Sequence, residues 1–303
     1  MTAITPQFKY KKPKKNWKYL FIALPLMALV LLFCYVPLMG WYLAFVEYRV
    51  GQPILSSEFV GFKFFKMLLG SRDFTRIMTN TSIFSLYYMG MLVLPPAFAI
   101  LLNELRSKRF SKLCQTAATL PNFVSWVLVY SVFYAVFTTD GVVNELLSIF
   151  GAKQSWLSSK KDVYWFQSFV WAWKNVGWKA IIYIAAIAGI DQTLYEAAAV
   201  DGANRWKQTL HITIPGLLPT FLVMFLLAIG AFVKNGLEQY MVFENAIISK
   251  KIETLELFTY NQGLKLLDYS YATAVGMFQS VISVVLLFFA NGLSKWIRGE
   301  SII

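Results

Sequence analysis

Charged side chains are scarce in this sequence. Asp, Glu, Lys and Arg make up 15% of the 303 residues, and apolar residues make up 57%. An ordinary soluble domain carries roughly 25% charged residues. The composition therefore excludes an ordinary soluble domain and indicates a chain that is solvated largely by lipid.

Residue types that often bind metals or catalyse reactions are also scarce, with 2 cysteines and 1 histidine. Cys34 lies within an apolar run and Cys114 beside a basic segment, so we expect no disulfide. His211 has no neighbouring Cys or His, and no nucleophile has a base at a recognised spacing, so we expect neither a metal site nor a catalytic site. The G-x-x-x-x-G-K-S/T phosphate loop is missing, so ATP hydrolysis by that route is not expected of this chain.

Long apolar stretches are, by contrast, abundant. A bilayer core requires about 20 residues of apolar helix. A spanning segment must be helical or belong to a closed barrel, and the alternation of barrel strands is missing. We therefore expect an all-α integral membrane protein with six transmembrane helices in one domain, residues 19–303, preceded by a basic tail, residues 1–18. The six stretches are 19–46, 77–102, 120–138, 165–188, 217–233 and 272–293.

Basic residues gather on one predicted side of the membrane. The net charge of +12 could suggest nucleic acid, but its distribution follows the excess of Lys and Arg in cytoplasmic segments. We therefore place both termini in the cytoplasm, in a multi-pass protein of a bacterial cell membrane, and expect lipid as a partner but no nucleic acid. The residues are Lys9, Lys11, Lys12, Lys14, Lys15, Lys18, Arg106, Lys108, Arg109, Lys112, Arg205, Lys207, Lys295 and Arg298.

The predicted cytoplasmic segment 189–216 is amphipathic, and we expect function there. Thr193 and Glu196 have the T-x-x-E spacing of a capping box, and Ala197 and Ala198 favour a helix of small side-chain bulk. The backbone of another protein could approach such a surface closely. The pattern predicts a short helix suited to docking.

A bend and a second short helix are expected next. Gly202 supplies backbone freedom at the corner, and Asp201 can cap the following helix, which would include Arg205. Pro215 lacks an amide donor and is expected to end or redirect that helix. A bent pair of helices at the membrane surface can seat in a groove of a partner and be pushed.

This segment resembles the EAA loop of permeases from binding-protein-dependent ABC importers, with Ile214 where the motif has Leu. The segments 174–191 and 271–291 are similar to carbohydrate-uptake permeases of the LplB kind. The residues that match the motif are Glu196, Ala197, Ala198, Gly202, Ile212 and Pro215.

The resemblance implies a type I ABC importer permease fold with half of a translocation pathway for a sugar, in particular an oligosaccharide. It implies that Glu196 meets a basic residue in a cleft of a separate ATPase, and that transport proceeds by alternating access. The partners implied are a second homologous permease, two ATPase subunits and an extracellular solute-binding protein. The chain itself would bind no cofactor, because ATP and Mg belong to the ATPase.

Polar residues within the spans are candidates for the substrate pathway, because charge inside a membrane is costly. Trp171, Lys174, Asn175 and Trp178 share a helical face on which a sugar could stack and form hydrogen bonds. Alternatively, the Trp residues form an interfacial belt while the lysines snorkel or pair with the second permease. Further candidates, for which helix packing is the alternative, are Asn235, Glu238, Tyr240 and Gln279.

Other functions remain open at this level. The solute could be other than a sugar, and a channel or ion-driven carrier would also have many spans. An integral-membrane transferase would need a cluster of carboxylates or His near one face. The predicted cytoplasmic acids available for that purpose are few, namely Glu104, Asp191, Glu196 and Asp201.

Overall fold

The computed structural model describes residues 17–152 and 154–298. Helices dominate these ranges, and their one sheet is a two-stranded antiparallel hairpin. The predicted all-α class is therefore confirmed for the described residues. Of the predicted basic tail, residues 1–18, the described ranges include only the backbone of residues 17 and 18. The side chain of Arg298 also lies outside the described part of the chain.

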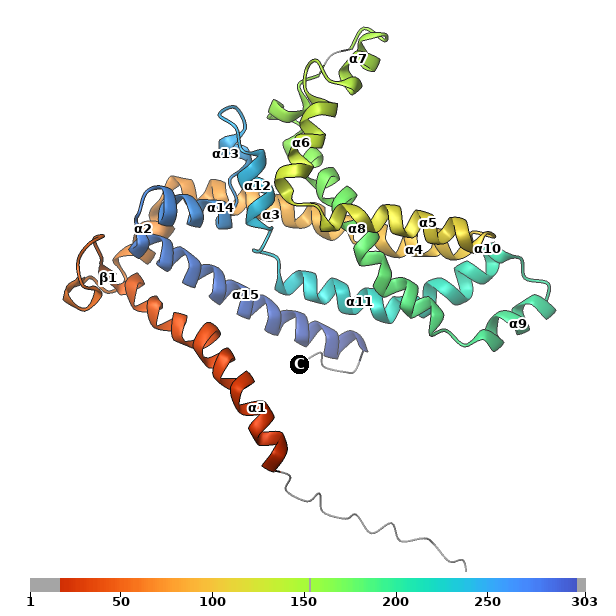
Figure 1. Cartoon of the computed structure of the whole chain (residues 1–303), viewed down its shortest axis with the longest axis horizontal. Helices are drawn as coiled ribbons and strands as arrows, with labels where there is room; N and C mark the ends of the chain where they lie inside the picture. Colours follow the sequence, from red (N-terminus) through yellow and green to blue (C-terminus); the bar gives the residue numbers. More distant parts are fainter. Residues whose placement is uncertain (1–16, 153, 299–303) are drawn as a thin grey trace, which may run out of the picture.

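The first span is a helix that changes type along its length. Pro25 lies inside it and Pro37 begins its last part, and each proline removes an amide donor from the helical ladder. None of its most apolar window is buried, and its first part extends away from the other helices in Figure 1. Its parts are α1 (Trp17–Val30), the π-helical η1 (Leu31–Tyr35) and the 3-10 helix η2 (Val36–Phe45).

A short hairpin and a short helix connect the first two spans. Val46 of β1 pairs with Phe59 of β2, and Lys63 binds Glu47 at 2.5 Å beside the hairpin. The elements are β1 (Val46–Glu47), η3 (Ile54–Ser56), β2 (Glu58–Phe59) and α2 (Lys63–Gly70).

The second span consists of α3 (Arg72–Met91) and α4 (Leu94–Glu104), and with the two residues between them it is 33 residues long. The side chain of Ser71 accepts a hydrogen bond from the Phe74 amide and caps α3. The interruption at residues 92–93 comes just before Pro95 and Pro96, each of which lacks an amide donor.

The third span differs from the predicted stretch 120–138. Pro121 lies in a short 3-10 helix, and the Ser125 side chain caps a new helix of 12 residues. The candidate span runs from Trp126 to Ser148, so the predicted boundaries are wrong. The elements are α5 (Lys108–Thr119), η4 (Leu120–Phe123), α6 (Trp126–Phe137) and α7 (Val142–Ser148).

The fourth predicted span is a single helix of 26 residues, α8 (Val163–Ala188), preceded by η5 (Trp156–Ser158). At 1.5 Å per residue its length is about 39 Å, enough to cross a bilayer core. Five helices among the described residues are long and apolar enough to span by composition, and α8 is not one of them. Lys174, Asn175 and Lys179 make it more polar, so the count of six spans stays a prediction.

The last two spans are α11 (Ile214–Gly230) and α15 (Tyr269–Arg298). Between them lies a folded segment of short helices. It contains α12 (Leu237–Phe243), α13 (Ser249–Ile252), α14 (Leu255–Tyr260) and the π-helical η7 (Asn261–Lys265). The segment between α8 and α11 contains α9 (Gln192–Val200), α10 (Arg205–Gln208) and the π-helical η6 (Thr209–Thr213).

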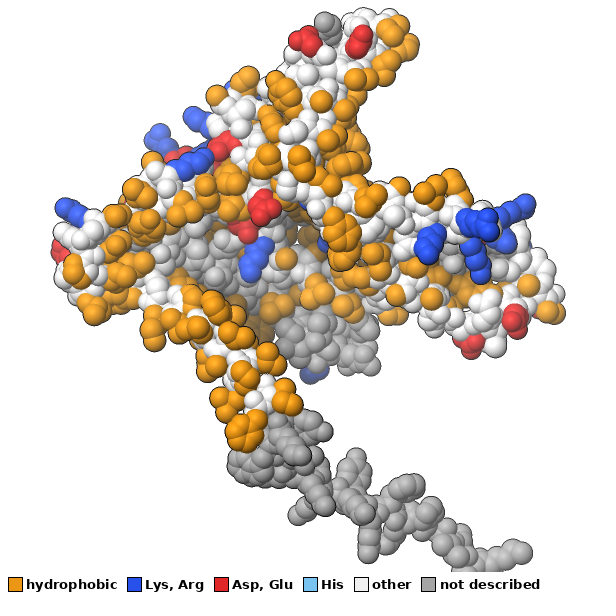
Figure 2. Space-filling view, viewed as in Figure 1, with side chains coloured by type: hydrophobic (Ala, Val, Ile, Leu, Met, Phe, Trp, Pro, Cys, Tyr) orange, Lys and Arg blue, Asp and Glu red, His pale blue; other side chains and the backbone are white. Residues whose placement is uncertain are grey.

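Helix α8 lies at the centre of the packing, against α3, α4, α5 and α11. In Figure 1, α9 and the junction of α4 with α5 lie at the end of the molecule opposite β1. Figure 2 shows apolar side chains over the outer helices and Lys and Arg side chains gathered at the end that holds α9. The fold therefore places the segment that resembles the EAA loop at a basic end of an apolar helix bundle.

Candidate functional site

The first helix of the loop, α9, begins differently from the prediction. Asp191 is its N-cap, and its carboxylate accepts a hydrogen bond from the Thr193 amide at 2.9 Å. This bond, followed by one to the Thr193 side chain, lowers the pKa of Asp191 below its usual value of 3.8. The capping box predicted for Thr193 and Glu196 is therefore wrong, because Thr193 already lies inside the helix.

The corner after α9 requires a glycine. Gly202 has a φ of +74°, in the left-handed region. The Gly202 amide donates to the Ala199 carbonyl, and the Ala203 amide donates to the Ala198 carbonyl at 2.9 Å. This pair of bonds is the Schellman ending of a helix. The predicted bend at Gly202 is confirmed.

The helix after the corner is capped by Asn204 and not, as predicted, by Asp201. The Asn204 side chain accepts from the Lys207 amide at 2.9 Å, whereas the amide of Asp201 still belongs to the end of α9. Asp201 is too close to the turn at Gly202 to take the extended backbone that an N-cap needs.

Pro215 does not end or redirect the second helix, so that prediction is wrong. Residues 205–230 form one continuous helical stretch through α10, η6 and α11. The wider π-helical turn from Thr209 to Thr213 lies directly before Pro215, where an α-helical amide is missing. The second half of the loop is therefore rigidly continuous with a span.

The side chains of α9 are largely exposed to solvent. No residue of α9 is buried, and Glu196 has no ion pair among the described residues. Exposed apolar side chains accompany it, with Val200 89% and Trp206 72% exposed. Figure 1 shows α9 projecting beyond the spans, and Figure 2 shows acidic side chains on it. Ala197 is exposed and Ala198 half-buried.

Three contacts that the sequence did not reveal connect α9 to the helix that follows it and connect that helix to α4. The Tyr195 hydroxyl lies 2.9 Å from that of Thr213, which ties α9 to η6. The Thr209 hydroxyl donates to the Glu104 carboxylate at 3.1 Å, and Arg205 lies 3.7 Å from the same group. Glu104 is the last residue of α4, so a displacement of α9 reaches two different spans.

The predicted pathway residue Lys174 is only 6% exposed and has a structural partner. Its ammonium group donates to the carbonyls of Pro121 and Asn122, each at 3.0 Å, and to that of Val124. These carbonyls lie at the break between α5 and α6, just before the third span begins. A buried ammonium thus satisfies backbone acceptors that the interruption leaves free.

The other three residues of that face lie in different surroundings. Trp171 stacks on Tyr88, with ring centroids 4.7 Å apart. The Asn175 carbonyl accepts from Asn122, and its amide donates to the Trp171 backbone carbonyl. Trp178 is 47% exposed and meets Phe123 edge to face. The face is therefore not one open wall, and a role in the pathway stays a prediction for each residue.

A cavity of about 300 Å³ brings Trp171 together with the predicted residue Asn235. Lys179 lies in its wall, with its ammonium group 5.1 Å from the Trp171 ring, and Lys234 lines it too. Asn235 is 4% exposed, and its side-chain amide donates to Ser85 at 2.8 Å. Its side-chain oxygen is buried without a hydrogen-bond partner among the described residues. We call this cavity the lysine pocket.

The remaining candidates contribute mainly to packing. Tyr240 is fully buried, and its hydroxyl lies 2.5 Å from that of Tyr88. Gln279 donates to the carbonyl of Val233 at 2.9 Å. Glu238 is exposed near the start of α12. None of them lines the lysine pocket, and their place in a pathway stays untested.

Comparison with known proteins identifies the family. Residues 96–299 match the profile described as "Binding-protein-dependent transport system inner membrane component". The chain is 37% identical to Protein LplB of Bacillus subtilis (strain 168), over 93% of this chain and 89% of that protein. It is also 37% identical to the polygalacturonan/rhamnogalacturonan transport system permease protein YteP of the same organism, over 97% and 95%.

Solved structures of ABC transporters also match this chain. A chain of a bacterial alginate ABC transporter, in complex with an alginate pentasaccharide-bound periplasmic protein, superposes with a TM-score of 0.86. The two are 31% identical, over 95% of this chain and 98% of that one. The match by sequence covers more than half of the chain, and the folds coincide. The chain belongs to the family of binding-protein-dependent transport system inner membrane components and is a permease subunit of an ABC transporter.

Proposed function

We propose that this permease forms half of the translocation pathway of an oligosaccharide importer and is driven through α9 by a separate ATPase, which holds ATP and Mg. The observation that carries the proposal is the projecting α9, which has a fixed corner at Gly202 and whose Glu196 has no ion pair in the described part of the chain. A rigid, exposed helix of this kind can seat in a groove. The α9 end would face the cytoplasm, together with both termini.

The relatives support both the solute class and the partners. They include a permease for polygalacturonan and rhamnogalacturonan, one for arabinooligosaccharides and a transporter for alginate. The alginate transporter is in complex with a periplasmic protein. For this chain we infer an extracellular solute-binding protein, a second homologous permease and two ATPase subunits.

Force would travel by two routes. The Tyr195–Thr213 contact joins α9 to the helix that continues into α11, and Glu104 joins the same helix to α4. Closure of the two ATPase subunits on ATP would shift both docked loops and so change the access of the pathway from one side to the other. The drive must come from contacts that differ between the two states.

The lysine pocket favours an acidic oligosaccharide. Lys179 and Lys234 have no ion-pair partner among the described residues, and no acidic side chain lines the pocket. The stacked Tyr88 and Trp171 offer flat aromatic surface for a sugar ring. The unpartnered oxygen of Asn235 can accept a bond from a sugar hydroxyl, while the lysines meet a carboxylate.

Coupling is tested on the assembled transporter in lipid nanodiscs, by the rate of ATP hydrolysis with and without solute. We expect Glu196→Lys and Gly202→Pro to abolish solute stimulation while membrane insertion persists. Glu145→Lys, an exposed acid on α7, is the matched control and should keep it. Normal stimulation in both loop variants would show that α9 does not couple to the ATPase.

Solute class is tested in the same preparation with an oligogalacturonate and a neutral maltooligosaccharide of equal length. We expect the acidic sugar to stimulate hydrolysis and Lys179→Met to reduce that stimulation by roughly tenfold or more, since a desolvated charge pair is lost. Stimulation by the neutral sugar alone would refute the acidic preference and leave the coupling role intact.

A further inference from the structure

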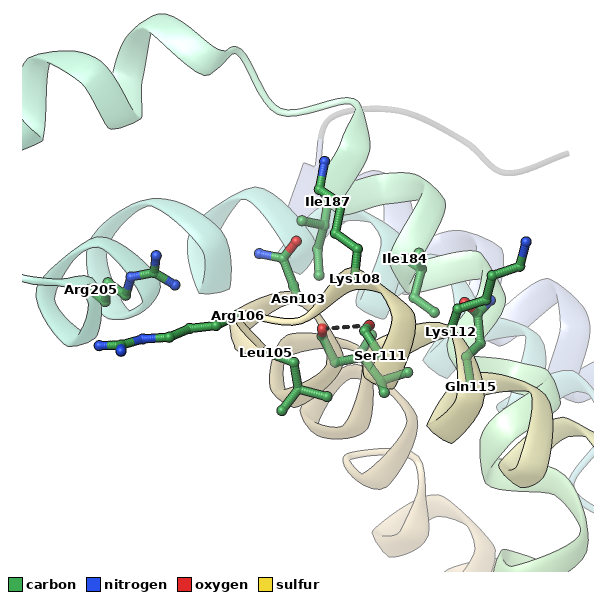
Figure 3. Close-up of a pocket in the computed structure, with 12 residues that line it drawn as sticks. Asn103, Leu105, Arg106, Lys108, Ser111, Lys112, Gln115, Ile184, Ile187 and Arg205 are labelled. Atoms are coloured by element: carbon green, nitrogen blue, oxygen red, sulfur yellow. Dashed lines mark hydrogen bonds between the residues drawn. The ribbon is translucent and has the colours of Figure 1, made fainter.

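A second cavity lies at the α9 end of the bundle, where α4 ends and α5 begins. Its volume is about 520 Å³, and we call it the basic pocket. Figure 3 shows Arg106 and Arg205 on one side of it, Lys112 on the other and Lys108 between them. The residues that line it on α4, α5, α8 and α10 include Asn103, Ser111, Gln115, Ile184 and Ile187.

The cations of this pocket are not neutralised within the described chain. Arg106, Lys108 and Lys112 have no carboxylate within ion-pair distance there. Arg205 lies 3.7 Å from Glu104, but that carboxylate also accepts from Thr209. Like charges held around one cavity repel each other, so an anion bound among them is stabilised.

The frame of the pocket is fixed. The Ser111 hydroxyl donates to the Leu102 carbonyl at 2.8 Å, which locks the end of α4 to α5. The Ser107 side chain caps α5 by accepting from the Phe110 amide. Lys108 and Lys112 are one helical turn apart on α5 and therefore project from the same face. Their positions do not depend on a flexible loop.

The lining beneath these charges is apolar. Ala99, Leu102 and Ile187 form part of it and are at most 9% exposed. On another face of α5, Phe110 is 52% and Leu113 65% exposed, as suits a helix that touches lipid. The basic pocket thus combines a cationic rim with an apolar lining, beside a helix surface that lipid can reach.

We propose that the basic pocket binds the phosphate-bearing headgroup of an anionic phospholipid. Its rim pairs with the phosphodiester, and its apolar lining receives the first part of the acyl chains. Basic pockets between membrane helices are suited to such headgroups, and each Lys or Arg adds attraction to an anionic lipid. Inorganic phosphate would use the rim but not the lining, so the lipid should bind more tightly.

The basic pocket lies beside the segment between α8 and α11, so a lipid bound there would affect the position of α9. Arg205 lies both in the rim and at the start of α10, directly after the corner at Gly202. A bound headgroup would draw Arg205 toward α5 and away from Glu104. The lipid would then hold α10 against α5 and so help to fix the base from which α9 projects.

The test uses the purified full-length chain and measures its thermal unfolding midpoint with added lipid. The probes are phosphatidylglycerol, phosphatidylcholine and inorganic phosphate, each at low and high salt. The variants are the double variant Lys108→Gln/Lys112→Gln and its matched control Lys160→Gln/Lys161→Gln, whose lysines are also exposed and lie before α8. Native mass spectrometry counts the lipids retained.

We expect phosphatidylglycerol to stabilise the wild-type chain and the control, with an affinity at least roughly tenfold above that of phosphatidylcholine at low salt. The α5 double variant should lose most of that difference. Three outcomes would each overturn the proposal: unchanged phosphatidylglycerol binding in the α5 variant, equal binding of phosphatidylcholine, or full stabilisation by inorganic phosphate. A fourth outcome, measured on the assembled transporter, would also overturn it: the α5 variant binds lipid normally but no longer co-purifies with the ATPase. The rim would then be a protein interface.

Discussion

The ammonium nitrogen of Lys174, in the middle of α8, lies 3.0 Å from the carbonyl oxygen of Pro121, at the break between α5 and α6. Asn122 and Val124 offer their carbonyls to the same group. An interrupted helix inside a membrane must satisfy its free backbone groups within the protein. Here the Lys174 ammonium group donates to these carbonyls, which explains why α8 carries a charged residue at its middle.

Replacing this ammonium group is expected to destabilise the fold. Lys174→Met leaves three carbonyls without their donor, and each buried unsatisfied group costs about 1–3 kcal/mol. We expect a lower thermal unfolding midpoint for the purified chain. Lys179→Met, in the same helix but with its ammonium group over a Trp ring, is the control and should unfold at nearly the wild-type temperature. A Lys174→Met chain of normal stability that fails only in transport would place Lys174 in the solute pathway.

The crossing of α8 over α5 depends on a missing side chain. A Cβ added to Gly177 would lie 2.1 Å from the carbonyl oxygen of Ala118, which is backbone and cannot turn aside. We expect Gly177→Ala to separate the two helices and to cost about 1–3 kcal/mol or more, as overpacking does. Unfolding in detergent measures this cost.

Gly276 provides the matched control for that prediction. It also lies within a membrane helix, but nothing comes within 4 Å of an added Cβ. Gly276→Ala should be neutral or slightly stabilising, because Ala is the better helix former. Equal effects of the two substitutions would mean that close packing at Ala118 is not what requires Gly177.

Substitutions at Gly202 distinguish a requirement for its backbone conformation from a requirement for space around it. Space around Gly202 is open, yet its φ of +74° is unfavourable for a β-branched side chain. Gly202→Val should therefore weaken solute-stimulated ATP hydrolysis, while Gly202→Asn should largely retain it, because Asn tolerates the left-handed region. Identical activity of the two variants would contradict a requirement for this backbone conformation.

The cap of α9 should respond to acid. Because the bond from the Thr193 amide lowers the folded-state pKa of Asp191 below 3.8, its stabilising effect is present above pH 3.8. The effect is lost as the pH falls through the lower folded-state value. Hydrogen exchange of the α9 amides should therefore accelerate in strong acid, and Asp191→Asn should remove this dependence. An unchanged acid profile in Asp191→Asn would show that another group titrates.

The sequence predicted local structure well where a backbone conformation is favourable for only one or two residue types. Gly202 marked a corner because few other residues take that backbone conformation. It was misleading at Thr193, because a T-x-x-E spacing does not show where the helix begins. Pro215 was misread too, since a π-helical turn absorbs a missing amide without ending the helix.

Contacts between residues distant in sequence could not be predicted. Lys174 was visible as a charge in an apolar run, but its partners lie 50 or more positions away. They belong to the segment between α5 and α6, which the prediction had wrongly placed inside the third span. Glu104 was visible only as one of a few predicted cytoplasmic acids, yet it joins Thr209 to α4. Such pairs depend on the packing of whole helices, which the pattern of a single sequence does not specify.

The central claim, that α9 docks into the ATPase, is tested most directly by a disulfide cross-link. Cys34 and Cys114 are first replaced by Ser, and Glu196→Cys is introduced in the assembled transporter together with a cysteine in the ATPase groove. The account predicts a reducible cross-link that blocks solute-stimulated hydrolysis, and none from Ile149→Cys, an exposed position next to α7. A cross-link from Ile149→Cys but not from Glu196→Cys would contradict the account.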